Sequence, residues 1–273
     1  MSAAEKLHWS SASATHVGRV RTLNEDACLE LENQGLWAVA DGMGGHAAGD
    51  YASNMIVDSL AGIQAPTSLG AFVEDVRACL QGVNTRLCAE AGRRRESIIG
   101  STVVLLLAFD SHCVSMWAGD SRVYLYRDGK LRQLTRDHSH IEDLIDRGVI
   151  TRDQAGHHPG GNVITRAVGV SDNLMLDSAM YEVKDRDTFL LCSDGLYNEV
   201  TDEQISQALG IASSHEACNA LVEHALAHGA RDNISAVVIH AEAEGQITRT
   251  RLNPVRRNAP SGDEGPDDPT TLR

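Results

Sequence analysis

The stretch Leu36–Gly45, which reads LWAVADGMGG, combines an expected strand with an acidic and glycine-rich exit. Its first five residues are all apolar, which is typical of a strand covered on both faces. The run ends at Asp41, and residues 46–62 then carry apolar side chains at helical spacing. A carboxylate is therefore expected directly beyond a buried strand, with a helix next along the chain.

Further strands and helices are expected on both sides of this stretch. Upstream, residues 8–17 and 27–32 read as short strands. Downstream, a second helix is expected from Ser68 into the basic triplet Arg93–Arg95. The remaining strands are expected within 102–109, 113–118, 122–126, 175–192 and 234–240, and the remaining helices within 201–209 and 214–228. Because runs of strands are followed by runs of helices, the sequence predicts a layered α+β domain.

Domain organisation follows from changes in composition along the chain. A single domain is expected over residues 1–245, and a polar tail rich in Pro, Gly and Asp, expected to be mobile, over 246–273. Residues 139–171 read as a helix–loop insert without a strong core pattern. Asp128-Gly129, between two alternating runs, predicts a tight β-hairpin, because both residues tolerate positive φ.

Five aspartates stand beside expected strands: Asp26, Asp41, Asp120, Asp194 and Asp232. Any one of them alone is better explained as a turn or a helix cap, since Asp is common in both. Together they favour another explanation, because a carboxylate just past a buried strand is rigidly held yet open to solvent. Hard cations such as Mg²⁺ and Mn²⁺ prefer oxygen ligands of this kind.

Composition excludes several classes of protein. The 273 residues carry 24 Lys+Arg against 38 Asp+Glu, a formal charge of -14, which argues against a general nucleic-acid binder. The longest apolar run, 103–109, is too short to span a bilayer, and residues 1–30 lack a secretory signal. Six cysteines without a CxxC pair are expected to be reduced. We therefore expect a cytoplasmic monomer that binds neither nucleic acid nor membrane.

Two other functions compete for parts of the sequence. Residues 42–47 match the dinucleotide pattern G-x-G-x-x-A, but Asp41 would place an anion beside the pyrophosphate, and a second helix follows where a strand is needed. Gly119-Asp120-Ser121 raises a serine hydrolase as the alternative, although Ser121 lacks the G-x-S-x-G context.

Five short motifs stand in order along the chain: Arg21-x-x-Asn24-Glu25-Asp26, Asp41-Gly42-Met43-Gly44-Gly45, Gly119-Asp120-Ser121-Arg122, Ser193-Asp194-Gly195-Leu196 and Arg231-Asp232-Asn233-Ile234-Ser235. In this order they resemble the motifs of metal-dependent protein phosphatases of the protein phosphatase 2C (PPM) type. The resemblance covers about residues 8–240, and two further segments, 134–139 and 164–169, resemble the bacterial branch.

The resemblance implies a four-layer αββα sandwich, in which two central antiparallel sheets are flanked by helices. It also implies two bound Mn²⁺ or Mg²⁺ ions. Asp41 would bridge both ions, and the Gly42 carbonyl would bind the first. Asp194 and Asp232 would complete the site of the second ion.

Other residues receive roles from the same resemblance. Asp120, with Asp194, would hold the third ion seen in bacterial members. Glu25 and Asp26 would orient bound water in the second shell, and Arg21 would grip the substrate phosphate, for which its planar cationic fork is suited. Residues 139–171 would form a flap beside the site.

The implied activity is hydrolysis of phosphoserine and phosphothreonine in proteins by a metal-activated water. The partners would be phosphorylated proteins, substrates of a bacterial Ser/Thr kinase that this enzyme opposes. Met43 stands where some relatives have His, so the resemblance leaves the general acid unassigned.

Overall fold

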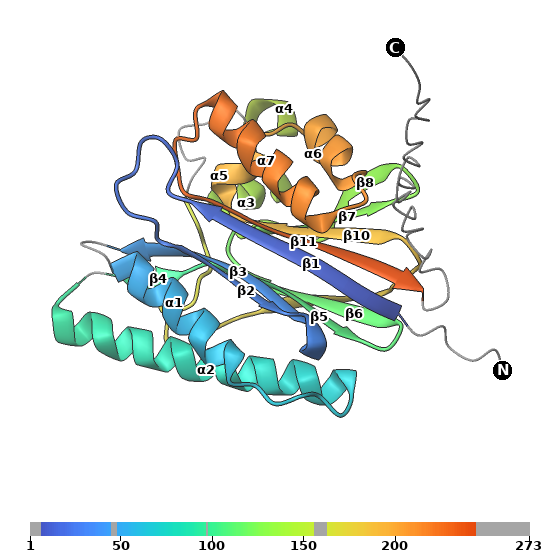
Figure 1. The fold of residues 1–273 in the computed structure, drawn as a ribbon. Helices are drawn as coiled ribbons and strands as arrows, with labels where there is room; N and C mark the ends of the chain where they lie inside the picture. The colour runs from blue at the N-terminus through green and yellow to red at the C-terminus, as the bar shows by residue number, and fades with distance from the viewer. Residues whose placement is uncertain (1–6, 45–47, 97, 156–162, 244–273) are drawn as a thin grey trace, which may run out of the picture.

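The computed structural model describes residues 7–44, 48–96, 98–155 and 163–243, which form four layers (Figure 1). Two antiparallel sheets pack face to face, and helices cover the outer face of each. The predicted α+β sandwich with αββα layering is therefore confirmed. The expected tail, 246–273, lies outside the described residues.

The first sheet has five strands in the order β1-β11-β10-β7-β8, and every neighbouring pair is antiparallel. Its strands are β1 (Leu7–His16), β7 (Arg122–Arg127), β8 (Lys130–Gln133), β10 (Asp187–Cys192) and β11 (Ile234–Ala243). The β7–β8 hairpin turns at Asp128 and Gly129, with φ of 51° and 74°, as the sequence predicts. The long β1–β11 pairing brings the two ends of the domain together.

The second sheet has six strands, in the order β2-β3-β5-β6-β9 with β4 beside β3. Its strands are β2 (Asp26–Leu31), β3 (Leu36–Gly44), β4 (Ile99–Ser101), β5 (Val103–Phe109), β6 (His112–Ala118) and β9 (Asp177–Glu182). A short 3₁₀ turn, η1 (Glu32–Gln34), joins β2 to β3. Strand β3 is central to the sheet and carries the stretch with which the sequence analysis began.

Helices α1 (Ala48–Ala61) and α2 (Leu69–Arg94) cover the second sheet, while α6 (Asp202–Leu209) and α7 (Ser214–His228) cover the first (Figure 1). Their starts follow the expected cap chemistry, because Ser68 Oγ accepts the Ala71 N–H at 3.2 Å. Between the sheets, Trp37 and Phe189 are fully buried. Burial of each such side chain contributes about 1.5–3 kcal/mol, so the interior holds the strand ends in place.

The strands expected within 175–192 are present as β9 and β10. The structure differs from the sequence predictions in two details. Strand β3 does not end at Asp41 but continues to Gly44, because Gly42–Gly44 pairs with β4. The last strand extends three residues beyond the predicted 234–240.

The insert at 139–171 contains α3 (His140–Asp146) and α4 (Arg152–Ala155). The isolated bridge Ser139↔Ile164 closes the base of the insert, and Ser101↔Val168 ties the insert to β4. Whether the insert moves as a flap stays a prediction.

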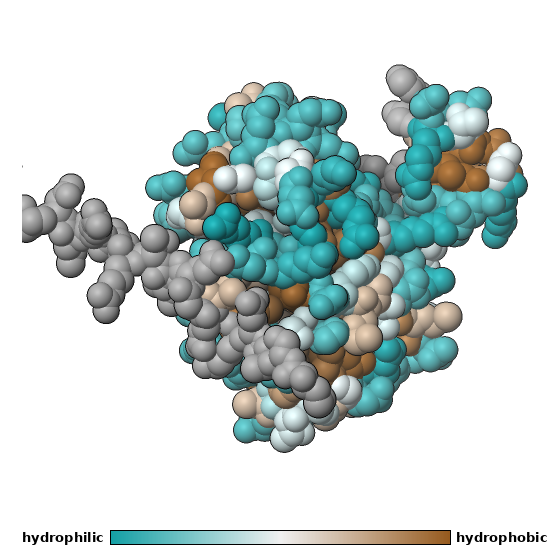
Figure 2. Space-filling view, turned by 90° about the vertical axis from the view of Figure 1, so that its right-hand side faces the viewer, coloured by the Kyte–Doolittle hydropathy of each residue, from teal (hydrophilic) through white to brown (hydrophobic). Residues whose placement is uncertain are grey.

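The face in Figure 2 is covered mainly by hydrophilic residues, with hydrophobic ones between them. Among the described residues, no helix is both long enough and apolar enough to cross a membrane.

Candidate active site

The five aspartates singled out from the sequence meet at one edge of the sandwich, which we call the acidic edge. Asp26 opens β2 and pairs with Asp41 in β3. Asp120 and Asp194 lie two residues beyond the ends of β6 and β10, and Asp232 lies two residues before β11. Both sheets therefore contribute, and the antiparallel order explains why strand starts and strand ends lie together.

Electrostatic coupling reflects this convergence. The pKa of Asp41 is raised well above its ordinary value, first because the carboxyl is desolvated and then because the four other aspartates lie near it. Burial, followed by nearby carboxylates, also raises the pKa of Asp120 to about 7. For Asp194, burial and Asp232 raise the pKa to about 6. Such a cluster favours the uptake of positive charge.

Asp26 is buried at the centre of this cluster. Its pKa rises to about 7, mainly through desolvation, although a hydrogen bond from Ser193 acts in the opposite direction. The Ser193 hydroxyl donates to Asp26 Oδ2 at 2.7 Å, which joins β2 of one sheet to the end of β10 in the other. The expected place of Asp26 close to the other carboxylates is therefore what the structure has.

The backbone of Asp41 is fixed by two neighbours from the β4–β5 segment. Its N–H donates to Thr102 Oγ1 at 3.2 Å, and its carbonyl accepts the Thr102 N–H at 2.8 Å. The Ser101 hydroxyl donates to the same carbonyl at 3.0 Å. The backbone of Asp41 is therefore held in place at this position.

Glycines allow Glu25 to approach this anchor. A Cβ at Gly42 would lie 2.1 Å from the Gly49 carbonyl oxygen, and one at Gly49 would lie 2.6 Å from Glu25 Oε1. The Gly42 N–H also donates to the Glu25 carbonyl at 3.1 Å. Only glycine permits this close packing of β3, α1 and the loop before β2.

Asn233 organises the loop that carries Arg21, a role that the sequence analysis missed. Its Oδ1 accepts the Glu25 N–H at 2.9 Å, and its Nδ2 donates to the carbonyls of Val17 and Leu23, each at 2.9 Å. A buried amide directly after Asp232 was the available signal, but its partners lie more than 200 residues away in sequence.

Arg21 lies at the solvent-exposed end of the acidic edge. Its NH2 donates to Asp232 Oδ2 at 2.7 Å, with side-chain exposures of 54% and 39%. This hydrogen bond and the charge of Asp232 raise the pKa of Arg21. Arg21 therefore lies beside Asp232, one of the expected metal ligands.

The donor set fits hard divalent cations in its chemistry. Asp26 Oδ1 and Asp120 Oδ1 are buried and have no hydrogen-bond partner among the described residues. Such orphaned carboxylate oxygens are costly unless a cation satisfies them. In the same described residues, no three acidic, histidine or cysteine side chains are placed to enclose an ion by themselves. The site implied by the resemblance also uses the Gly42 carbonyl and water.

The two competing functions find no support here. Ser121 is buried, and its hydroxyl lies 2.8 Å from Thr102 Oγ1, so it is not presented as a nucleophile. Gly42–Gly44 forms a strand paired with β4, which is not the turn of a dinucleotide site.

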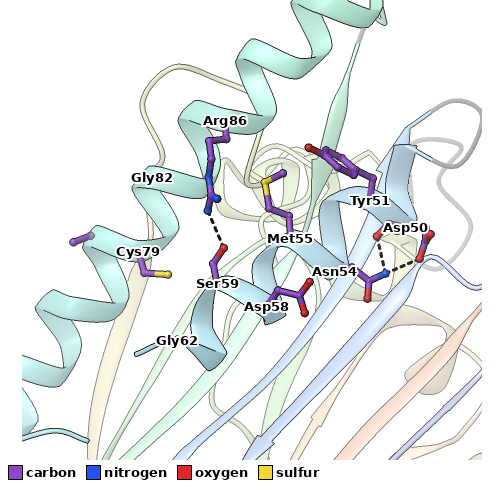
Figure 3. A pocket seen from close by; sticks show the side chains of 11 residues that line it. Asp50, Tyr51, Asn54, Met55, Asp58, Ser59, Gly62, Cys79, Gly82 and Arg86 are labelled. Atoms are coloured by element: carbon purple, nitrogen blue, oxygen red, sulfur yellow. Dashed lines mark hydrogen bonds between the residues drawn. The ribbon is translucent and has the colours of Figure 1, made fainter. Parts of the chain in front are cut away.

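A separate hollow of about 900 Å³ lies between α1 and α2 (Figure 3). Arg86 of α2 reaches Ser59 of α1 there, with NH2 2.8 Å from Oγ, and Asn54 Nδ2 donates to Asp50 Oδ1 at 2.6 Å. None of the five aspartates lines it. The chemistry therefore concentrates at the acidic edge and not in this hollow.

Comparison with known proteins decides the family. The family model described as Protein phosphatase 2C matches residues 15–229, most of the chain. This chain belongs to the protein phosphatase 2C family. The resemblance predicted from the five motifs is confirmed.

Individual relatives extend this result. The serine/threonine protein phosphatase PstP of Mycobacterium tuberculosis is 35% identical over 262 residues, which is 96% of this chain and 49% of PstP. The chain thus spans about half the length of this curated relative.

Solved structures agree. PppA, described as a key regulatory component of T6SS in Pseudomonas aeruginosa, is 46% identical with a TM-score of 0.81, covering 86% of this chain and 98% of PppA. The catalytic domain of PstP in complex with two manganese ions is 34% identical with a TM-score of 0.79, covering 86% of this chain and 99% of that domain.

Proposed function

We propose that this chain is a metal-dependent phosphatase that hydrolyses phosphoserine and phosphothreonine in proteins. The observation that carries the proposal is the meeting of five carboxylates from both sheets at the acidic edge, two with orphaned buried oxygens. A relative of the same family holds two manganese ions. When bound, two divalent ions supply an activated water and neutralise charge on the phosphoryl group.

The residue roles follow the placement of the side chains. Asp41, Asp194 and Asp232, with the Gly42 carbonyl, would hold two ions, Mn²⁺ or Mg²⁺. Asp120 would hold a third together with Asp194. The raised pKa values of Asp41, Asp120 and Asp194 mean that bound cations compete with protons for the same oxygens, so metal affinity rises with pH.

Two side chains outside this set act on substrate and water. Arg21 has an exposed guanidinium beside Asp232, where it can contact a phosphate oxygen. Glu25 is held by Asn233 on one side and packs against Gly49 on the other, so it can orient water without binding an ion directly.

The proposed function also implies partners and a cellular location for the enzyme. Phosphorylated proteins would be the partners, as substrates of a cognate Ser/Thr kinase that the phosphatase opposes. We propose that the enzyme is a cytoplasmic monomer. Its catalytic domain would span residues 1–245. A neighbouring gene for a Ser/Thr kinase would support the pairing.

The test is hydrolysis of p-nitrophenyl phosphate and of phosphoserine and phosphothreonine peptides by the purified chain. Activity is expected with added Mn²⁺ or Mg²⁺ and is abolished by EDTA, while Ser121→Ala remains active. Full activity in EDTA that Ser121→Ala abolishes would instead establish the serine hydrolase. Efficient hydrolysis of phosphotyrosine peptides alone would contradict the substrate class.

A further inference from the structure

Asp120 is held through its backbone by residues that the proposed chemistry does not use. Its own carbonyl accepts the Tyr197 hydroxyl at 3.1 Å. The N–H of Gly119, one residue earlier, donates to His138 Nδ1 at 3.2 Å. Asp120 Oδ1 has no hydrogen-bond partner among the described residues, so these backbone contacts set where its carboxylate lies.

His138 fixes Gly119 at both of its polar groups. Besides the ring contact, the His138 N–H donates to the Gly119 carbonyl at 2.9 Å. Because Nδ1 accepts a hydrogen bond, the neutral ring carries its proton on Nε2, which lies 3.2 Å from Asp177 Oδ2. Trp117 stacks on the imidazole with a centroid distance of 6.0 Å. The ring is therefore locked in orientation.

The turn that His138 grips accepts only glycine. Gly119 has a φ of +121°, and a Cβ there would lie 2.6 Å from the Thr102 side chain. Thr102 is the residue that also anchors the backbone of Asp41. A displaced Gly119 would therefore disturb both Asp41 and Asp120.

Tyr197 joins Asp120 to Asp194. It is the last residue of α5 (Asp194–Tyr197), whose first residue is Asp194. Its ring is covered by the Arg122 guanidinium, which lies 3.5 Å from the ring centroid and helps to hold the ring in place. The hydrogen bond to the Asp120 carbonyl thus fixes the spacing between these two aspartates.

The neighbouring residues Asp137 and His138 support both the Tyr197 contact to Asp120 and the contact to Gly119. Arg122 is clamped by Asp137, with Nε to Oδ1 at 3.0 Å and NH2 to Oδ2 at 2.7 Å. Asp137 directly precedes His138. The segment after β8 therefore holds the Tyr197 contact through Arg122 and the Gly119 contact through the imidazole.

We infer that Tyr197 and His138 are positioning residues that hold the Asp120 carboxylate at a fixed distance from Asp194 for binding a divalent cation. The inference rests on the proposed function in assigning a cation to this pair. Neither residue touches substrate or cation; each acts through the backbone of Asp120 or of its neighbour.

The first test measures Mn²⁺ binding by isothermal titration to the full chain. Tyr197→Phe removes only the hydroxyl, and its matched control is Tyr181→Phe, because Tyr181 also donates to a backbone carbonyl, that of Leu134, at 3.1 Å. Tyr197→Phe is expected to raise the Kd for the Mn²⁺ ion whose binding depends on Asp120. The expected increase is about 2- to 10-fold, which is the usual effect of losing one hydrogen bond. Tyr181→Phe leaves that Kd unchanged.

A second pair of variants separates the two ring contacts of His138. In His138→Asn the amide oxygen replaces Nδ1 and still accepts the Gly119 N–H. In His138→Gln the amide replaces Nε2, so the Asp177 contact survives and the Gly119 contact is lost. Weaker Mn²⁺ binding in His138→Gln, with recovery in His138→Asn, supports the inference. The opposite order overturns it, because it would make the Asp177 contact the important one.

Asp120→Asn shows which Mn²⁺ ion depends on Asp120 for binding. It also distinguishes failure of the positioning inference from failure of the third-ion assignment. If Asp120→Asn weakens binding and both Tyr197→Phe and His138→Gln, folded by circular dichroism, do not, the positioning inference alone is wrong. If Asp120→Asn leaves Mn²⁺ binding unchanged, the inference and the third ion both fall. The proposed phosphatase activity is tested independently by wild-type turnover of phosphopeptide.

Discussion

The two ends of the acidic edge are built differently. At one end, Arg21 and Asp232 form an ion pair between half-exposed side chains, carried by loops. At the other end, Asp120 is buried, and its backbone carbonyl accepts a hydrogen bond from Tyr197. The backbone N–H of the preceding residue, Gly119, donates to His138. The exposed end can exchange partners at little cost, because a surface ion pair contributes only about 0–1 kcal/mol. The buried end is preorganised and costly to disturb.

This difference separates two tasks of a phosphatase. Recognition of a phosphate needs a cation that reaches solvent and can change partners as substrate arrives and product leaves. Binding a divalent ion needs oxygens that are already in place before the ion arrives. Asp41 and Asp194 lie between the two ends, so they should respond to changes at either.

The largest expected effect comes from removing the charge of a proposed metal ligand. Asp41→Asn and Asp232→Asn should each lower turnover about 100- to 1,000-fold, because each removes a ligand charge from a preorganised electrostatic site. Steady-state kinetics with saturating Mn²⁺ measures this, and circular dichroism confirms folding. Near-native turnover in both folded variants would show that the cation site lies elsewhere.

A smaller effect is expected at the exposed end. Arg21→Ala should lower kcat/KM for phosphopeptide about 10- to 100-fold, mainly through KM, because a charge-assisted hydrogen bond to phosphate is lost. Isothermal titration with Mn²⁺ is the control and should show little loss of affinity. Unchanged KM with much weaker metal binding would mean that Arg21 serves only to orient Asp232.

The smallest effect concerns stability at the buried end. The pKa of Asp120 is about 7 in the folded chain and near 3.8 when unfolded, so its ionisation destabilises the fold as pH rises through 7. In EDTA, Asp120→Asn should be more stable than wild type at pH 8, by on the order of 2 kcal/mol. Because the wild-type carboxyl becomes protonated, this advantage should shrink by pH 6.

Urea unfolding at both pH values measures the Asp120→Asn difference. His138 and His240, whose pKa values are lowered by burial, are present in both proteins and cancel in the comparison. An advantage that grows as pH falls would contradict the raised pKa of Asp120.

The two ends of the acidic edge are not equally predictable from the sequence. Asp120 and Asp194 follow apolar runs, so their placement just past strand ends could be inferred from local pattern alone, whereas Asp41 lies inside β3. The Arg21–Asp232 pair joins residues 211 positions apart, and its geometry depends on the β1–β11 pairing. A contact between residues so far apart in the sequence cannot be predicted from local periodicity.

The supporting residues were harder still to predict. Tyr197 reads locally as an apolar residue of a short helix, and His138 as one histidine among twelve. Their roles come from contacts with the loop after β6, which Tyr197 and His138 meet only in the folded chain. Likewise β3 runs on through Gly42–Gly44, against the low strand propensity of glycine, because β4 lies beside it.

The buried thiols bear on how the protein would withstand oxidants. Burial raises the pKa values of Cys28, Cys113, Cys192 and Cys218 to about 12, so almost no thiolate forms at neutral pH. Peroxide and alkylating reagents attack the thiolate, and the proposed chemistry uses no sulfur nucleophile. Dephosphorylation by this chain should therefore continue under peroxide stress that inactivates phosphatases with a catalytic cysteine.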